Sequence, residues 1–133
     1  MNSRKKGADG ERELARVLAE YGYKARRGQQ YSGANGDADV VGLPDIHIEC
    51  KRVERLNIDK ALQQAVDDAY ADSIAQGKRI RPAVFHRAND DRKRGSTKGT
   101  WKVTMALNDW MWLYKAAETT QKQPKNNPKT TNG

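Results

Sequence analysis

The sequence predicts one α/β domain with a mixed central β-sheet flanked by helices. Three observations support this fold class: an amphipathic helical segment near the start, a run of short strand-like segments after it, and then a helix, two strands and a last helix. Segments that alternate in this way pack as a sheet with helices on its faces. The chain of 133 residues is long enough for one modest core.

The first helix is expected over residues 8–23. Apolar side chains recur there with the spacing of one helix face, at Leu14, Val17, Leu18 and Tyr21. Asp9 is the expected N-cap, and Gly22 is the expected end of the helix. Residues 1–7 before it are rich in charge and are expected to form a flexible basic arm.

Three short strands are expected next. The first, over residues 23–30, is basic, and the glycine-rich segment after it predicts a turn or a mobile loop. A strand over residues 37–42 and another over 45–52 are separated only by a short turn. Their closeness predicts a β-hairpin.

The next helix is expected over residues 58–76, because apolar residues recur there on one face and Gly77 follows as a stop. A buried strand over 81–87 and a further strand over 100–106 come next. The polar, mostly basic loop between them completes this part of the predicted fold.

The last helix is expected over residues 107–118 and is apolar around much of its circumference. Such a helix is either buried in the core or part of an interface, and the stretch from Trp110 to Tyr114 is the candidate surface. Residues 119–133 have no apolar content to fold around and predict a disordered polar tail. The predicted domain therefore covers residues 1–118.

The composition indicates the class of partner. A formal net charge of +8 favours a polyanion, with nucleic acid first and an acidic membrane surface second. Charge alone does not decide this, because many basic proteins bind no polyanion.

The single cysteine, Cys50, excludes an internal disulfide and a cysteine-cluster zinc site. The charged N-terminus, and the lack of any apolar run near the ~20 residues that span a bilayer, predict an intracellular protein.

The strand over residues 45–52 carries polar side chains where a core needs apolar ones. Because side chains alternate along a strand, His47, Glu49 and Lys51 share one face, while Cys50 points to the opposite face and is expected to pack in the core. Asp39 on the preceding strand reaches the Glu49 face if the two strands pair. His47 could reach the border of the site, but a solvent-facing position is the expected one.

Two close carboxylates repel each other unless a cation lies between them. Oxygen ligands of this kind suit Mg²⁺ or Mn²⁺, and such a metal readies a water for attack on a phosphate. Lys51 beside it would orient that water or stabilise the phosphate in the transition state. The alternative is an ordinary Glu–Lys pair on a solvated strand face.

Glu11 gives an independent indication. It lies three residues before Leu14 and falls on the apolar stripe of the first helix, whereas Glu13 lies off the stripe beside Arg16 and Glu20. A carboxylate on a buried face is explained if it faces a metal or phosphate site. It is equally explained by a favourable position near the helix N-terminus.

The segments "KGADGERELARVLAEYGY", "GDADVVG" and "IHIECKR" together resemble the Holliday junction resolvase branch of the PD-(D/E)XK nuclease superfamily. They are similar in particular to the archaeal resolvases and to small phage-encoded endonucleases, over residues 6–106. The resemblance implies a restriction-endonuclease-like core, a Mg²⁺-dependent DNA endonuclease with Mn²⁺ as a substitute, and a role in DNA recombination and repair. It also implies a homodimer, since a four-way junction is cut symmetrically in two strands.

The resemblance assigns roles residue by residue. Asp39 and Glu49 match the metal-binding acids, Glu11 contributes directly or through water, and Lys51 positions the nucleophile. A glutamine near the site best matches Gln64, although the adjacent Gln63 stays open. Asp37 shares a face with Asp39 and ranks second to it. The Pro44–Asp45 pair matches the family's Pro-Asp motif by chance. Asp45 lies too close to Glu49 in the chain, whereas the family's aspartate lies further upstream, on the preceding strand.

Basic and polar residues around the two loops are the expected DNA contacts. They are Arg26, Arg27, Gln30 and Ser32 before Asp39, and Arg87, Arg92, Lys93, Arg94 and Lys98 in or beside the second loop. Each of them, taken singly, is also explained as a solvated surface charge. Phosphate contacts of this kind add affinity without reading sequence.

The same residues are compatible with two other functions. One is a nuclease of the same superfamily that acts on duplex, flap or nicked DNA. The other is a basic DNA-binding module without catalysis, in which the acids are surface charges.

Overall fold

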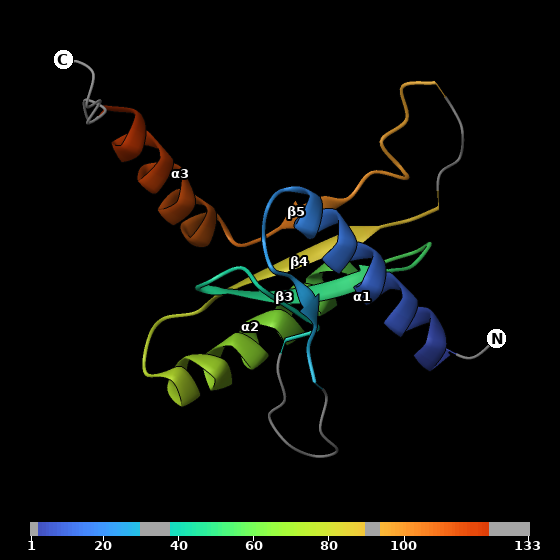
Figure 1. The fold of residues 1–133 in the computed structure, drawn as a ribbon, viewed down its shortest axis with the longest axis horizontal. Helices are drawn as coiled ribbons and strands as arrows, with labels where there is room; N and C mark the ends of the chain where they lie inside the picture. Colours follow the sequence, from blue (N-terminus) through green and yellow to red (C-terminus); the bar gives the residue numbers. More distant parts are fainter. Residues whose placement is uncertain (1–2, 30–37, 90–93, 123–133) are drawn as a thin grey trace.

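The computed structural model describes residues 3–29, 38–89 and 94–122 (Figure 1). Its elements, in chain order, are α1 (Ser3–Glu20), β1 (Arg26–Arg27), β2 (Val40–Val41), β3 (Ile46–Arg52), α2 (Ile58–Gln76), β4 (Arg81–Arg87), β5 (Lys102–Thr104) and α3 (Leu107–Lys122). The predicted α/β class, with a mixed sheet and flanking helices, is confirmed at this level.

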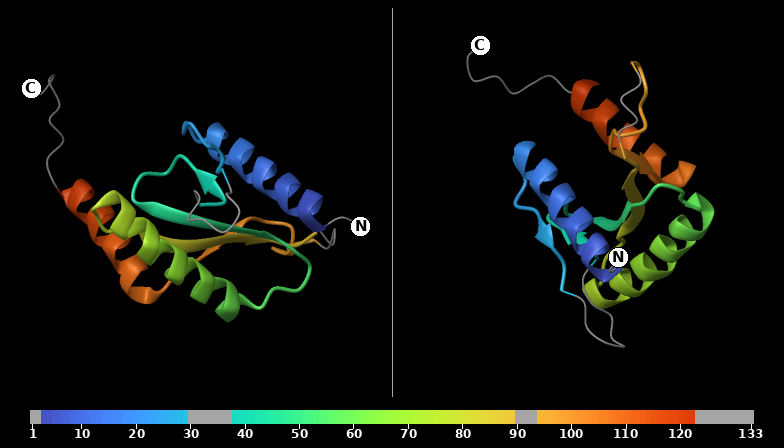
Figure 2. Two further views of the ribbon diagram at one scale, coloured as in Figure 1. Left: turned by 90° about the horizontal axis from the view of Figure 1, so that it is seen from below. Right: turned by 90° about the vertical axis from the view of Figure 1, so that its right-hand side faces the viewer.

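The five strands of the described chain form one sheet in the order β1-β2-β3-β4-β5. The predicted hairpin is present: β2 and β3 are antiparallel, with Val40 opposite Ile48. The strands β3 and β4 are parallel, so the chain crosses between them through α2. Figure 2 shows α1 and α2 on opposite faces of the sheet.

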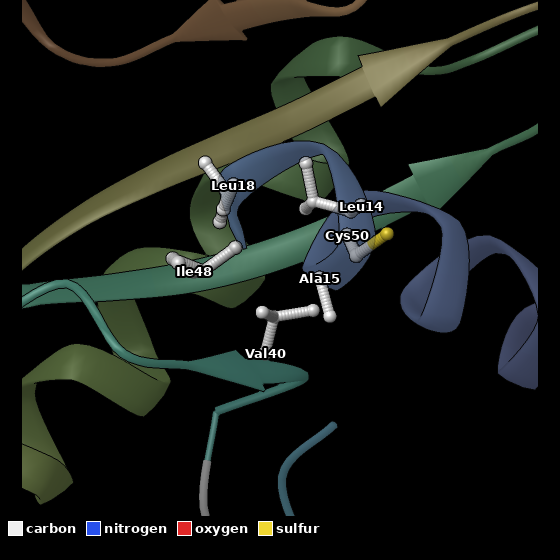
Figure 3. Close-up of a cluster of buried hydrophobic side chains, with 6 residues drawn as sticks. All are labelled: Leu14, Ala15, Leu18, Val40, Ile48 and Cys50. Carbon is white, nitrogen blue, oxygen red and sulfur yellow. The ribbon is translucent and has the colours of Figure 1, made fainter. Parts of the chain in front are cut away.

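The α1 face of the sheet holds the larger apolar cluster (Figure 3). Leu14, Ala15 and Leu18 of α1 pack there against the hairpin residues Val40, Ile48 and Cys50. Cys50 lies in this core, as its place on β3 predicts. The odd-numbered residues of β3 must therefore face α2 on the other side.

Small residues bring α2 close to the sheet. Ala61, Ala65 and Ala69 are its buried residues, and the first two pack with Val84 of β4. The Asn57 side chain accepts a hydrogen bond from the Lys60 N–H and caps the start of the helix. The predicted end is also found, since Gly77 follows the last helical residue in a left-handed conformation with φ 69°.

The ends of the first and last helices differ from the sequence prediction. The helix α1 begins at Ser3, so Asp9 lies inside it rather than at its cap, and residues 3–7 are helical rather than a loose arm. The helix α3 continues to Lys122, four residues beyond the predicted boundary at 118. The predicted strands are also shorter than expected on both sides of residues 30–37, which lie outside the described residues.

Core packing of α3 is not found. The helix extends away from the sheet in Figure 1, and its large apolar residues are exposed, namely Leu107, Trp110, Trp112, Leu113 and Tyr114. Its first turn is the attachment point: the buried Asp109 carboxylate accepts a hydrogen bond of 2.9 Å from Arg81 of β4. The Arg81 guanidinium also lies 4.5 Å from the ring centroid of Trp112. None of the helices in the described ranges is long and apolar enough to cross a membrane.

Candidate metal centre

The polar face of β3 is buried beneath α2. Glu49 is 3% exposed and His47 is 4% exposed, while Lys51 at the strand end is partly exposed. The expectation that His47 faces solvent is therefore wrong. The sequence pattern placed these three side chains on one face, but it did not predict that a helix covers that face.

The β2–β3 pairing brings Asp39 to the same place. Asp39 directly precedes β2, and the register that pairs Val40 with Ile48 continues to a position opposite Glu49. The Asp39 N–H donates to the Ile48 carbonyl at 3.1 Å, and its carboxylate Oδ2 accepts from the Cys50 N–H at 2.8 Å. These two hydrogen bonds hold the Asp39 carboxylate where β2 begins beside β3. We call this place, formed by Asp39 and Glu49, the Asp39 edge.

The two carboxylates affect each other. Burial, and then the negative charge of Asp39, raises the pKa of Glu49 to about 7. Burial also raises the pKa of Asp39, against the lowering effect of the Cys50 N–H, and the charge of Glu11 raises it further. The Lys51 ammonium, with Nζ 3.4 Å from Glu49 Oε2, opposes both shifts. A divalent cation among these oxygens would relieve the same repulsion.

Two aspartates of α2 complete the polar layer under the sheet. The His47 Nδ1 lies 3.3 Å from Asp72 Oδ2. One ligand atom each from His47, Glu49 and Asp68 lie within 4.8 Å of one another, so this group could hold a metal ion. These aspartates were missed in the sequence, although each follows a buried alanine, Ala65 or Ala69, by three residues and so borders the buried helix face.

The position of the site glutamine follows from the same helix. Asp72 lies beside His47, and Asp68 lies beside Glu49. The helix α2 is therefore antiparallel to β3. Gln64 lies one turn before Asp68 and is therefore on the Lys51 side of this row. Gln63 instead donates to Asp67 at 3.0 Å on the exposed side. Helix phase thus favours Gln64, which is itself exposed.

Glu11 lies close enough to Asp39 for its charge to act on it, and it already has a partner. Its Oε1 accepts a hydrogen bond of 2.9 Å from Arg27 Nε of β1, and the Glu11 side chain is 14% exposed. Its charge acts on Asp39, as the raised pKa of Asp39 indicates. Glu11 therefore borders the acidic group, and Arg27, expected to contact DNA, balances Glu11 in this structure.

Glu13 forms a separate polar network on the α1 side of the sheet. Its carboxylate accepts from Arg52 Nε at 3.1 Å and from Trp101 Nε1 at 3.2 Å, and it also pairs with Arg87. The sequence pattern placed Glu13 off the buried stripe and gave it no role. Arg87, which the sequence suggests as a DNA contact, pairs with Glu13 in this network.

Some of the other residues predicted to contact DNA or support the site are described by the structure, and the rest are not. Arg26 and Arg94 are exposed, and Lys98 Nζ lies 3.6 Å from Glu54. Gln30, Ser32, Asp37, Arg92 and Lys93 lie outside the described residues.

Asp45, the acid of the literal Pro-Asp pair, lies in the turn before β3. It adopts a left-handed φ of 70°, and its Oδ1 is 2.9 Å from Lys78 Nζ. It lies at the end of β3 opposite to Lys51.

No protein-family model matches the sequence, and neither a curated protein nor a solved structure matches it.

Proposed function

We propose that this chain is a metal-dependent, structure-selective DNA endonuclease of the PD-(D/E)XK type, and specifically a Holliday junction resolvase. One observation carries the proposal: Asp39, Glu49 and Lys51 meet where two strands pair, with Glu49 buried and Asp39 partly buried. They occupy the positions that the sequence resemblance assigns to the metal-binding acids and the lysine. The mixed sheet with a helix on each face is compatible with a restriction-endonuclease-like core.

The donor set fits a hard divalent cation. Glu49 offers a buried carboxylate and Asp39 a partly buried one, and burial, followed by the charge of Asp39, raises the pKa of Glu49 to about 7. Glu11 is the third acid, and its charge acts on Asp39. Mg²⁺ bound there would supply an activated water and would neutralise charge on the phosphate.

Lys51 is suited to act on the phosphodiester directly. Its ammonium is held beside Glu49 at 3.4 Å and is partly exposed, so it is accessible from solvent. From there it would orient the attacking water or stabilise the extra negative charge that develops on the phosphate. Attack by water breaks one P–O bond and leaves a phosphate and a hydroxyl at the two new ends.

The proposed substrate and assembly rest on charge and symmetry. The net charge of +8 suits DNA, with Arg26, Arg94 and Lys98 as candidate phosphate contacts. Two symmetric cuts in a four-way junction need two sites related by a two-fold axis. A second copy docked on the exposed aromatic residues of α3 would provide them.

The decisive assay offers the purified protein four substrates: a four-way junction, a duplex, a flap and a single strand. Each is incubated with Mg²⁺ or with chelator. The proposal expects symmetric nicks in the junction with Mg²⁺ alone. Equal cleavage of plain duplex would reject the resolvase assignment and keep the nuclease. Junction binding without cleavage by Mg²⁺ or Mn²⁺ would favour a non-catalytic DNA-binding module.

A pair of asparagine variants tests the choice of aspartate. Asp39→Asn removes a carboxylate at the proposed metal edge and is expected to lower the cleavage rate by about 100-fold or more, a loss typical of removing transition-state charge stabilisation. Asp45→Asn, the matched control, removes an acid at the far end of β3 and is expected to cut normally. Normal cutting by Asp39→Asn would overturn the assignment.

A further inference from the structure

We infer that the chain binds a second divalent cation, of the transition-metal class, between His47, Glu49 and Asp68. Glu49 is shared with the proposed Asp39 site, and the inference depends on the proposed function only through that shared residue. The second site is made by one strand and one helix, whereas the Asp39 edge is made by two strands.

The three donors are already gathered. One nitrogen and two carboxylate oxygens lie within 4.8 Å of one another. Around an octahedral ion with bonds of about 2.1 Å, neighbouring donors are about 3 Å apart and opposite donors about 4.2 Å apart. A movement of at most about 1 Å by each side chain would therefore bring these donors into a coordination shell. Asp68 is exposed and free to make that movement.

The state of His47 is the second observation. Its ring is almost fully buried, and Nδ1 contacts Asp72 Oδ2 at 3.3 Å. Within the described ranges Nε2 has no hydrogen-bond partner. A buried imidazole nitrogen with no partner is unfavourable, whereas a carboxylate behind a histidine is the usual support for a metal-ligating ring, because it fixes the tautomer that leaves the other nitrogen free to bind.

The donor chemistry selects the cation. Mg²⁺ and Ca²⁺ prefer shells made of oxygen alone, whereas Mn²⁺, Co²⁺ and Zn²⁺ also accept an imidazole nitrogen beside carboxylate oxygens. The oxygen-only edge of Asp39, Glu49 and Glu11 is therefore the place for Mg²⁺, and the histidine-containing group is the place for the softer ion. A carboxylate that reaches both ions is the usual link in paired metal sites.

Metal binding by the full chain tests the inference without any DNA. Chelator-treated protein is titrated with Mn²⁺ and, separately, with Mg²⁺, and binding is followed by calorimetry and by the electron paramagnetic resonance signal of free Mn²⁺. His47→Gln and Asp68→Asn are each expected to weaken Mn²⁺ binding at this site about tenfold or more. Both variants are expected to leave Mg²⁺ binding at the Asp39 edge within about twofold.

The control is Asp67→Asn, which removes the neighbouring acid on the exposed side of α2. It is expected to leave Mn²⁺ binding unchanged. Because Asp68 is exposed, Asp68→Asn is expected to fold even if His47→Gln does not, and circular dichroism of the metal-free variants checks this. Equal Mn²⁺ affinity in wild type, Asp68→Asn and Asp67→Asn would overturn the inference. Loss of Mn²⁺ binding in Asp68→Asn, in a protein that cuts no DNA, would support the inference and reject only the nuclease proposal.

Discussion

Glu49 is the residue at which folding and the candidate chemistry oppose each other most directly. A carboxylate that is 3% exposed and adjacent to Asp39 is destabilising when both are ionised. A fold evolved only for stability would place apolar residues there. Retaining two such acids, with Lys51 beside them, is consistent with a site whose ligand is a cation.

The raised pKa of Glu49 makes the stability of the metal-free protein dependent on pH. Folded Glu49 keeps its proton up to a pKa of about 7, whereas unfolded Glu49 loses it near 4.5. The folded state therefore binds more protons in this window, and stability falls as the pH rises from 4.5 to about 7. The full difference corresponds to about 3 kcal/mol.

Urea unfolding in chelator at several pH values between 4 and 8 measures this loss. Glu49→Gln removes the titrating group and serves as the control, so its stability should vary less over the same window. Addition of Mg²⁺ should stabilise the wild type more at pH 7.5 than at pH 5, because the cation competes with the proton. Identical pH profiles for wild type and Glu49→Gln would contradict the prediction.

Glu13 predicts a stability effect unrelated to the metal edge. It is the common acceptor for Arg52, Arg87 and Trp101, and its side chain is 25% exposed. Removing it leaves two partly buried guanidinium groups without their shared carboxylate. Glu13→Ala should therefore lower the free energy of unfolding by about 3 kcal/mol. Glu20→Ala, at the exposed end of the same helix, should change it by less than about 0.5 kcal/mol. Chemical denaturation at pH 7 compares the two, and equal values would count against the network.

At the scale of elements, β3 and α2 show which features the sequence could predict and which it could not. Their bounds followed from periodicity, and so did the sharing of one face by Glu49 and Lys51. Periodicity could not show which face of the sheet α2 covers, because the crossover from β3 to β4 joins strands whose two faces both carry buried residues. Asp68 was missed for that reason, and His47 was given the wrong environment.

The alanine stripe of α2 gives a prediction at this scale. Ala65 is fully buried against Val84, so a larger side chain there must push the helix away from the sheet. Ala65→Leu should lower the free energy of unfolding by about 1–3 kcal/mol. It should also weaken Mn²⁺ binding, because Asp68 moves away from Glu49 with the helix. Ala75→Leu, on the exposed side of α2, is the matched control, and thermal melts and Mn²⁺ titrations of both variants check the difference.

At the scale of the whole molecule, α3 is the element with the least support from the rest of the chain. Its apolar pattern indicated burial but could not show by what, and the described chain leaves five large apolar side chains of this helix exposed. Trp110 and Tyr114 stack with ring centroids 5.2 Å apart and present one aromatic surface. Exposed apolar surface of this kind marks an interaction site.

A dimer formed through that surface has a direct test. Sedimentation velocity should find the wild type as a dimer at micromolar concentration. The double variant Trp110→Asp, Tyr114→Asp should be monomeric with its thermal stability nearly unchanged, because both rings are already half exposed. Lys115→Glu, on the same helix, should remain dimeric. A monomeric wild type would rule out this interface.

The hydrogen bonds of Asp39 and of Glu13 join residues that are separated by very different lengths of chain. Asp39 and Cys50 are 11 residues apart, whereas Glu13 and Trp101 are 88 apart. Short loops lose less entropy on closing than long ones, so the hairpin with Asp39 and Glu49 is the part that can assemble early during folding, and the Glu13 network joins the ends late. The acids would then meet before α2 excludes water from them, while their charges are still well solvated, and the burial that raises the pKa of Glu49 would come only as the helix docks.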